Sequence, residues 1–195
     1  NIGILVCGPP GSGKTCFATS FPTPILLLDF DLKADSAAAW HAADQKRLED
    51  IDVRPLGRRL DGSDPVVEFL QIVKELGEQQ KAGTMKYKTL VIDSATTFSS
   101  AILNHIVRTN PGVKRVASVQ GVQPGVQDYG ILKREFEKLI PGLLSLPMNV
   151  VMTSHIKADR SEITGEIIRS PIMDGSFATT LPIFFKGVYR VYMKD

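Results

Sequence analysis

The segment Gly8-Pro9-Pro10-Gly11-Ser12-Gly13-Lys14-Thr15 carries the clearest chemical signal in the sequence. Its pattern, G-x-x-x-x-G-K-[ST], is that of a P-loop, in which glycines let backbone N–H groups wrap a phosphate. We expect Lys14 to place a cation on the β- and γ-phosphates of ATP, and the Thr15 hydroxyl to bind Mg²⁺. The helix that follows adds the positive end of its dipole. The predicted ATP-binding residues are Gly8, Pro9, Pro10, Gly11, Ser12, Gly13, Lys14, Thr15 and Cys16.

A P-loop needs a partner carboxylate at the end of another buried strand, where it holds Mg²⁺ and its hydration shell. The segment Lys88-Thr89-Leu90-Val91-Ile92-Asp93-Ser94 meets this requirement, because its apolar residues end abruptly at Asp93. We therefore expect Thr15 and Asp93 to be the metal ligands. The alternative is that Asp93 or Ser94 only caps the next helix.

Hydrolysis also needs a group that orients or deprotonates the attacking water. Asp29 and Asp31 follow the apolar run Ile25–Leu28, and residues two apart in an extended segment share a face. Asp31 lies further beyond the strand and is the better candidate, although both carboxylates could instead form a solvated strand end. His155 follows another apolar run and could sense the γ-phosphate if that run lies beside the P-loop strand. Otherwise it is a structural histidine.

The remaining sequence supplies the elements that must position these residues. Four nearly continuous apolar runs are typical of parallel strands buried on both faces: Ile2–Cys7, Ile25–Asp29, Thr89–Asp93 and Asn149–Thr153. The alternating run Gly187–Met193 indicates an edge strand or a partly wet face. Helical patterns cover Gly13–Ser20, Ser36–Glu49, Pro65–Gln80, Ser99–Arg108 and Asp128–Ile140. This alternation predicts one α/β domain over residues 1–195, with a mostly parallel sheet and helices on both faces.

Composition agrees with a soluble protein of this class. The chain has 195 residues, of which 43% are hydrophobic and 23% charged, and no apolar run approaches the roughly 20 residues that span a bilayer. Cys7 and Cys16 flank the glycine-rich loop, and we expect both to be reduced thiols in a cytoplasmic protein. A net charge of +2 says little about partners, so the placement of the cations must decide.

Two long stretches interrupt the strand–helix alternation. Residues 109–127 are rich in Gly, Gln, Val and Pro, and residues 156–171 are polar and charged, with a turn signal at Thr164-Gly165. We expect both to be irregular. Connections of this length inside a compact domain tend to be functional or mobile.

The order of these motifs resembles the RecA-type core: a P-loop, a strand ending in an acidic pair, Val91-Ile92-Asp93-Ser94, a loop, a helix, a strand ending in Thr153-Ser154-His155, and a second loop. It is most similar to the short, core-only RecA-like ATPases of bacteriophages, which are associated with recombination and single-strand annealing. The resemblance covers Ile4 to Tyr192, and its most specific parts are Met152–His155 and Pro171–Gly175. It implies a RecA-like P-loop NTPase core in which Asp31, Lys14 and His155 are catalytic. It also places Asp35 near the adenine, with Trp40 as a stacking neighbour.

The resemblance further implies that residues 109–127 and 156–171 are DNA-binding loops. Cations in such loops would bind DNA phosphates without reading the base sequence. The candidates are Arg108, Lys114, Arg115, Lys157, Arg160 and Arg169. The alternative is that both stretches are solvated surface loops.

The expected function is a Mg²⁺-dependent ATPase that binds single-stranded DNA and acts in DNA recombination or annealing, in the cytoplasm of a bacterial host if a phage encodes it. The resemblance implies a homo-oligomer with ATP at the subunit interface, completed by a cation of the neighbouring subunit. Two other functions remain open: a ring-type DNA helicase or motor core, and a nucleotide switch or assembly ATPase that does not bind DNA. Candidates for the neighbour's cation are Lys157, Arg160, Lys186 and Arg190.

Overall fold

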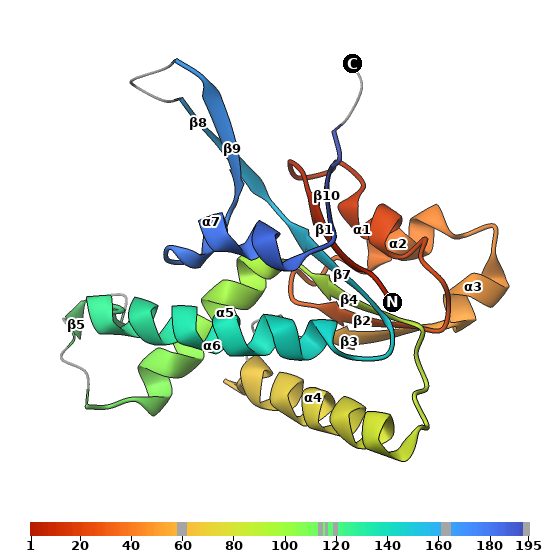
Figure 1. The fold of residues 1–195 in the computed structure, drawn as a ribbon, viewed down its shortest axis with the longest axis horizontal. Helices are drawn as coiled ribbons and strands as arrows, with labels where there is room; N and C mark the ends of the chain where they lie inside the picture. Colours follow the sequence, from red (N-terminus) through yellow and green to blue (C-terminus); the bar gives the residue numbers. More distant parts are fainter. Residues whose placement is uncertain (58–61, 113–114, 116, 119–120, 161–164, 193–195) are drawn as a thin grey trace.

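The structure is a computed structural model that describes residues 1–57, 62–112, 115, 117–118, 121–160 and 165–192 (Figure 1). Within these residues the main feature is a six-stranded sheet in which all neighbouring strands run parallel. The order across the sheet is β10-β1-β7-β4-β2-β3. The strands are β1 Gly3–Cys7, β2 Ile25–Asp29, β3 Ile51–Pro55, β4 Thr89–Asp93, β7 Asn149–Ser154 and β10 Gly187–Arg190.

This order confirms the expected parallel sheet and brings three predicted strand ends together. β7 lies between β1 and β4, so the segment before His155 is beside the P-loop strand, as the sensor hypothesis requires. Among the described strands β10 pairs only with β1, so it is an edge strand, as its alternating pattern indicated. The other edge, β3, was missed by the sequence analysis, because its residues are partly or fully exposed and lack a buried apolar run.

Helices surround the sheet, as expected, although their bounds differ from the predicted ones. α4 has the signals that predicted it: Asp64 caps its amino end, Pro65 is its first residue, and Gly83, with a φ of 67°, ends it. α6 continues through Pro141, where the prediction stopped, because Leu143 in its last turn is buried in the core. The helices are α1 Lys14–Ala18, α2 Asp35–Trp40, α3 Gln45–Glu49, α4 Pro65–Ala82, α5 Ala95–Thr109, α6 Val126–Leu144 and α7 Phe177–Thr180, the last followed by the 3₁₀ turn η1 Leu181–Phe184.

The larger hydrophobic cluster lies on the sheet face covered by α4, α5 and α6, and a smaller one lies under α1. A series of phenylalanine rings runs through the larger cluster. Ring centroids are 4.7 Å apart between Phe30 and Phe98, 5.5 Å between Phe98 and Phe136, and 5.2 Å between Phe136 and Phe177. This series links the turn after β2 to the segment that follows the β8–β9 hairpin.

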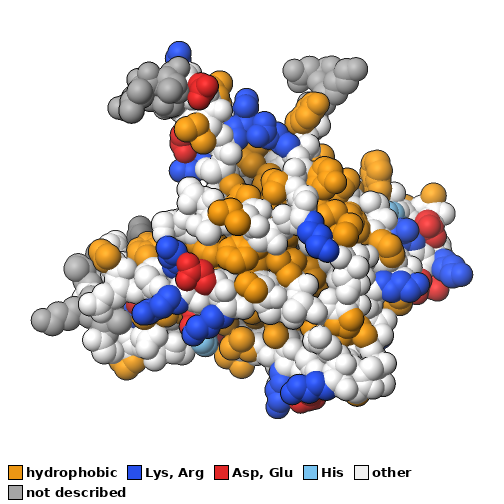
Figure 2. All heavy atoms as spheres, in the orientation of Figure 1, with side chains coloured by type: hydrophobic (Ala, Val, Ile, Leu, Met, Phe, Trp, Pro, Cys, Tyr) orange, Lys and Arg blue, Asp and Glu red, His pale blue; other side chains and the backbone are white. Residues whose placement is uncertain are grey.

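The two stretches predicted to be irregular contain short antiparallel strands. In the first, β5 Ala117–Ser118 pairs with β6 Gly121–Val122. In the second, β8 Ile156–Arg160 and β9 Ile167–Pro171 form a hairpin that projects from the body of the molecule (Figure 1). The prediction of an irregular loop was wrong here, because the hairpin is solvated and its polar side chains gave no strand pattern. Figure 2 shows Lys and Arg side chains gathered between this hairpin and β10. No helix among the described residues has the length and apolarity needed to cross a membrane.

Candidate functional site

The P-loop joins β1 to α1, and each of its glycines is needed for a physical reason. Gly11 and Gly13 have φ values of 74° and 82°, a region that favours glycine. A Cβ on Gly8 would lie 2.5 Å from the Ser12 hydroxyl and 2.5 Å from the Val191 carbonyl oxygen. The N–H of Gly8 donates to the Ser154 carbonyl at 3.1 Å, which ties the loop to β7.

Lys14 is the first residue of α1 and is only 6% exposed. Its Nζ donates to the carbonyl oxygens of Gly8 at 3.1 Å and Pro9 at 2.8 Å. Burial lowers the pKa of Lys14, although Asp93 and Asp31 oppose this shift. The ammonium is thus held inside the loop, where it can exchange loop carbonyls for phosphate oxygens.

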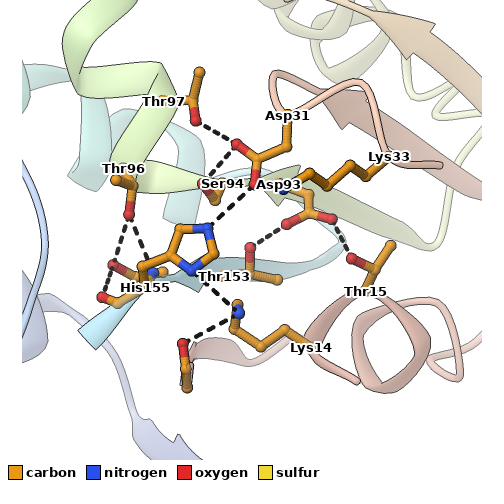
Figure 3. Close-up of polar contacts among 12 residues, drawn as sticks. Lys14, Thr15, Asp31, Lys33, Asp93, Ser94, Thr96, Thr97, Thr153 and His155 are labelled. Carbon is orange, nitrogen blue, oxygen red and sulfur yellow. Dashed lines mark hydrogen bonds and ion pairs between the residues drawn. The ribbon is translucent and has the colours of Figure 1, made fainter. Parts of the chain in front are cut away.

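Asp93 ends β4 with both carboxylate oxygens hydrogen-bonded. The Thr15 hydroxyl donates to Oδ2 at 2.5 Å, and the Thr153 hydroxyl donates to Oδ1 (Figure 3). Burial raises the pKa of Asp93, while these two hydrogen bonds lower it. Ser94 occupies the N-cap position of α5, but no side chain caps the helix there, so the alternative role of Asp93 as a helix cap is wrong.

The pair formed by Thr15 and Asp93 fits Mg²⁺. Both offer oxygen atoms, which this hard cation prefers, and they converge from neighbouring elements. No cluster of three or more His, Cys, Asp or Glu side chains that could hold a metal occurs in the described part of the chain. The protein would therefore supply only part of the ligand set, leaving the rest to phosphates and water, as is usual for Mg²⁺ at a nucleotide.

Asp31 and Asp29 occupy different environments. The Asp31 carboxylate is 9% exposed; its Oδ1 accepts hydrogen bonds from the hydroxyls of Ser94, at 3.0 Å, and Thr97, and its Oδ2 faces His155. Asp29 turns back into its own loop, where Oδ2 accepts the N–H of Ala34 at 2.8 Å. Its buried Oδ1 has no hydrogen-bond partner among the described residues. Asp31 is thus the carboxylate that faces His155, and neither carboxylate forms the solvated strand end that was the alternative; the catalytic role of Asp31 stays a prediction.

His155 lies between Lys14 and Asp31 (Figure 3). Its Nδ1 is 3.5 Å from the Lys14 ammonium, and its Nε2 is 3.5 Å from Asp31 Oδ2. An ammonium can only donate, so Nδ1 must accept and the ring proton belongs on Nε2, facing the carboxylate. Burial and the Lys14 charge lower the pKa of His155, although Asp31 opposes them, which favours a neutral ring.

The first turn of α5 holds both Asp31 and His155 and was not singled out from the sequence. The Thr97 hydroxyl donates to Asp31, and the Thr96 hydroxyl accepts the backbone N–H of His155 at 3.1 Å. The Thr153 hydroxyl contact with Asp93 was missed as well. The available signal was the group of hydroxyl residues Ser94, Thr96 and Thr97 directly after Asp93, which could have indicated polar contacts at this edge of the sheet.

The predicted adenine side of the site lies where α1 meets α2. Cys16 is a free thiol, and its Sγ donates to the Ser36 carbonyl at 3.6 Å, which joins the two helices. Asp35 begins α2 and is exposed, and Trp40 ends it with 67% exposure. Contacts of these residues with adenine remain predictions.

Two predicted DNA-binding cations, Arg108 just before the first stretch and Arg115 within it, pair with carboxylates of the fold. Arg108 contacts Asp64, the cap of α4, at 2.8 Å. Arg115 forms an ion pair of 2.7 Å with Asp128, and both side chains are almost completely buried. Lys114 lies outside the described residues. The DNA role of these three residues therefore stays a prediction, and the setting of Arg115 is that of a structural ion pair.

The hairpin places its cations differently. Lys157 contacts Asp159 at 2.9 Å, and Arg160 Nε donates to the Gly165 carbonyl at 3.3 Å. Arg169 and Arg190 line a cavity of about 120 Å³ between the hairpin and β10, together with Ser170 and apolar side chains. Neither arginine has a carboxylate partner among the described residues, so both are available to an anion.

The fold and this constellation define a P-loop ATPase: a buried lysine in a glycine-rich loop, and a threonine–aspartate pair at the end of a neighbouring parallel strand. Over residues 1–194 the sequence matches the family described as an AAA domain, and the chain belongs to that family. A search of curated protein sequences finds no match.

The fold is similar to that of an ATPase from the type III secretion system of pathogenic bacteria, with a TM-score of 0.50 and 14% sequence identity. The similarity covers 81% of this chain and 45% of that one, so the chain spans less than half the length of the secretion ATPase. At this identity the likeness concerns the fold alone.

Proposed function

We propose that this chain is a Mg²⁺-dependent ATPase whose cycle is coupled to the binding of single-stranded DNA, as in the phage RecA-like proteins that its motifs resemble. The observation that carries the proposal is the position of the β8–β9 hairpin. Ile156 begins the hairpin immediately after His155, and the N–H of Ile172, just beyond it, donates to the His155 carbonyl at 2.8 Å. The hairpin carries Lys157, Arg160 and Arg169 beside an equal number of acidic residues, and it starts and closes at the residue that faces the phosphate site.

In the proposed hydrolysis, each side chain has one task. Asp31 accepts the proton of the attacking water at Oδ2, the oxygen that faces Nε2 of His155 and that neither Ser94 nor Thr97 contacts. Lys14 moves from the loop carbonyls to the γ-phosphate, and Thr15 and Asp93 hold Mg²⁺. When bound, Mg²⁺ neutralises charge on the β- and γ-phosphates.

The same lysine couples the nucleotide to the hairpin. When the Lys14 ammonium binds a phosphate, it leaves its contact with Nδ1 of His155. The imidazole ring can then turn toward the γ-phosphate. Because Ile156 and Ile172 are joined to the His155 backbone, movement of this residue reaches both strands of the hairpin. Exposed cations on the hairpin, including Arg160 and Arg169, would bind DNA phosphates.

The deciding experiment measures the ATPase rate with and without single-stranded DNA, with Lys14→Ala as the blank. We expect Mg²⁺-dependent hydrolysis that DNA stimulates, and a loss of about 10²-fold or more in Lys14→Ala, because a charge-stabilising group is removed. EDTA should abolish the activity.

A second variant tests the hairpin. Arg160→Ala/Arg169→Ala should weaken DNA binding and reduce the slope of log affinity against log salt by about 0.7 for each DNA phosphate that is no longer neutralised. Arg134→Ala, an exposed arginine of α6, is the matched control and should change neither quantity. A rate indifferent to DNA, together with no DNA binding in the presence of ATP, would overturn the DNA part and leave an ATPase.

One observation favours a second candidate function. β9 exposes Ile167 and Ile168 at 58% and 57%, beside the hairpin's cations, and exposed apolar side chains of this kind suit a protein partner. The chain would then be a nucleotide switch or assembly ATPase. DNA-independent hydrolysis would support this function, whereas duplex unwinding would indicate a ring-type DNA motor.

A further inference from the structure

The turn that carries Asp31 contains an unusual backbone conformation. Leu32 has a φ of 55° and is the one residue other than glycine with a positive φ in the described part of the chain. L-residues rarely adopt this left-handed conformation, because Cβ approaches the neighbouring carbonyl oxygen. Strain of this kind persists only where the surroundings enforce it, and it concentrates at functional sites.

The surroundings that enforce it come from β2 and the end of β3. The N–H of Leu56 donates to the Asp29 carbonyl at 2.8 Å, which sets Gly57 beside the turn. A Cβ built on Gly57 would lie 2.3 Å from Leu32 Cγ, 2.7 Å from Cδ1 and 2.8 Å from Cδ2. The Leu32 side chain therefore lies directly on the bare backbone of Gly57, and although it is 54% exposed, a methyl group at position 57 would force it to move.

The turn is anchored on both sides of Leu32. Before it, the N–H groups of Phe30 and Asp31 both donate to the Asp93 carbonyl, at 2.6 and 3.2 Å. After it, the N–H of Ala34 returns to the Asp29 carboxylate at 2.8 Å. Between these anchors the chain must reverse, and the left-handed Leu32 is where it does so while Asp31 still points at Ser94, Thr97 and His155.

We propose that Leu32 and Gly57 are positioning residues for Asp31: contact between the leucine side chain and the glycine backbone holds the turn that keeps the Asp31 carboxylate in the site. Neither residue belongs to the P-loop or to the Thr15–Asp93 pair, and the inference rests on the proposed role of Asp31. Such packing affects the rate by fixing the position of the catalytic group, because a displacement of about 1 Å at that group can cost about 10²-fold in rate.

The test is a size exchange between the two positions. Gly57→Ala adds a methyl group where the Leu32 side chain lies, and we expect kcat to fall 10-fold or more with little change in KM, because the ATP-binding residues lie elsewhere. Adding Leu32→Ala removes the three clashing carbon atoms and should restore most of kcat. Gly77→Ala, in the interior of α4 with no atom near its Cβ, is the matched control and should leave kcat unchanged.

A readout independent of activity is the side-chain NMR signal of His155, one of three histidines in the chain. We expect the signal to shift in Gly57→Ala, since Asp31 is its neighbour, and to return in the double variant. An unchanged signal and unchanged kcat in Gly57→Ala would overturn the proposal, as would a fall in kcat that Leu32→Ala does not restore.

The same set of variants separates this inference from the proposed function. In an Asp31→Asn background, Gly57→Ala should cost nothing further, because both changes act on one carboxylate. An additional loss of kcat in the Asp31→Asn background would show that Leu32 and Gly57 do not act through Asp31. If Asp31→Asn itself left kcat unchanged, the catalytic role of Asp31 would fail, while the His155 signal would still report whether the pair positions the carboxylate.

Discussion

His155 is held between a cation and a carboxylate, and its contact with the Lys14 ammonium depends on a neutral ring. Burial and the Lys14 charge lower its pKa in the folded protein, and burial, with Arg47, lowers that of His41 as well. The unfolded chain therefore takes up protons near pH 6.5, whereas the folded protein does so only at lower pH. Stability contributed by these rings is present above pH 6.5 and is lost as the pH falls below it.

We accordingly predict that the free energy of unfolding decreases between pH 7.5 and 5.5, by at most about 1.4 kcal/mol per pH unit for each histidine. Asp93, whose pKa is raised, has the opposite sign at lower pH, so the comparison is between the wild-type protein and His155→Gln. The variant should show a flatter dependence in urea titrations followed by circular dichroism. An identical dependence in both proteins would mean that His155 is not held neutral by the fold.

At the residue scale, the sequence analysis predicted the site side chains that carry a charge or belong to a motif, and it missed the site side chains that do neither. Lys14, Thr15, Asp31, Asp93 and His155 all converge, because the carboxyl ends of parallel strands meet at one edge of the sheet. The hydroxyls of Thr97 and Thr153 were not predicted, since threonine is common and its partner depends on the packing of α5 and β7. Leu32 was equally hidden, because nothing in the sequence marks a leucine with a positive φ, and Gly57, beside which it packs, is far from it in the chain.

At the scale of elements, the buried pair Arg115–Asp128 joins the stretch after α5 to the start of α6. The guanidinium also donates to the Asn110 carbonyl at 2.6 Å, and Asp128 accepts the N–H of Gly125 at 2.8 Å. The ion pair thus holds the connection between α5 and α6 through Arg115, and Asp128 caps the amino end of α6. Arg115 holds the pKa of Asp128 below its usual range, so the carboxylate stays charged in its buried position.

Removal of the arginine leaves that charge buried and unpaired, which costs far more than the loss of an exposed ion pair. We predict that Arg115→Ala lowers the urea midpoint of unfolding clearly more than Lys133→Ala, which removes an exposed ion pair with Glu137 on α6. Equal midpoints would indicate that Arg115 is free to serve a ligand, as the resemblance to DNA-binding loops implied.

Elements were predictable where burial leaves a pattern. β2 and β4 were predicted with the bounds that the structure shows, because all their residues are buried. β3 and the β8–β9 hairpin were missed for the opposite reason, since their exposed side chains carry little apolar periodicity. α5 begins at Ala95, several residues before the predicted start, because its polar first turn faces the site.

At the scale of the whole molecule, the candidate neighbour cations can now be ranked. Lys157 is paired with Asp159, Arg160 donates to the Gly165 carbonyl at 3.3 Å, and Lys186 donates to the Asn1 carbonyl at 3.2 Å. Arg190 has no carboxylate partner among the described residues, lies on the edge strand beside Cys7, and adjoins the exposed side chains of Val188 and Tyr189. An edge strand with such side chains suits contact with another copy of the chain.

We predict that Lys14→Ala and Arg190→Ala are each impaired as ATPases and that a mixture of the two regains activity. In a cyclic assembly mixed one to one, roughly a quarter of the interfaces would join an intact P-loop to an intact Arg190 by random assortment. The ATPase rate of the mixture, compared with the mean of the separate proteins, measures this. No gain on mixing would place Arg190 within its own subunit's site or exclude such an interface.

Trp40 is the only tryptophan of the chain, and it is 67% exposed at the end of α2. Its fluorescence should already have the red-shifted emission of an indole in water, so unfolding will change the spectrum little and loss of structure must be followed by other means. The same property makes it a background-free optical reporter. A blue shift when ATP is added, with no change in secondary structure, would show that the nucleotide or a neighbouring subunit has covered α2.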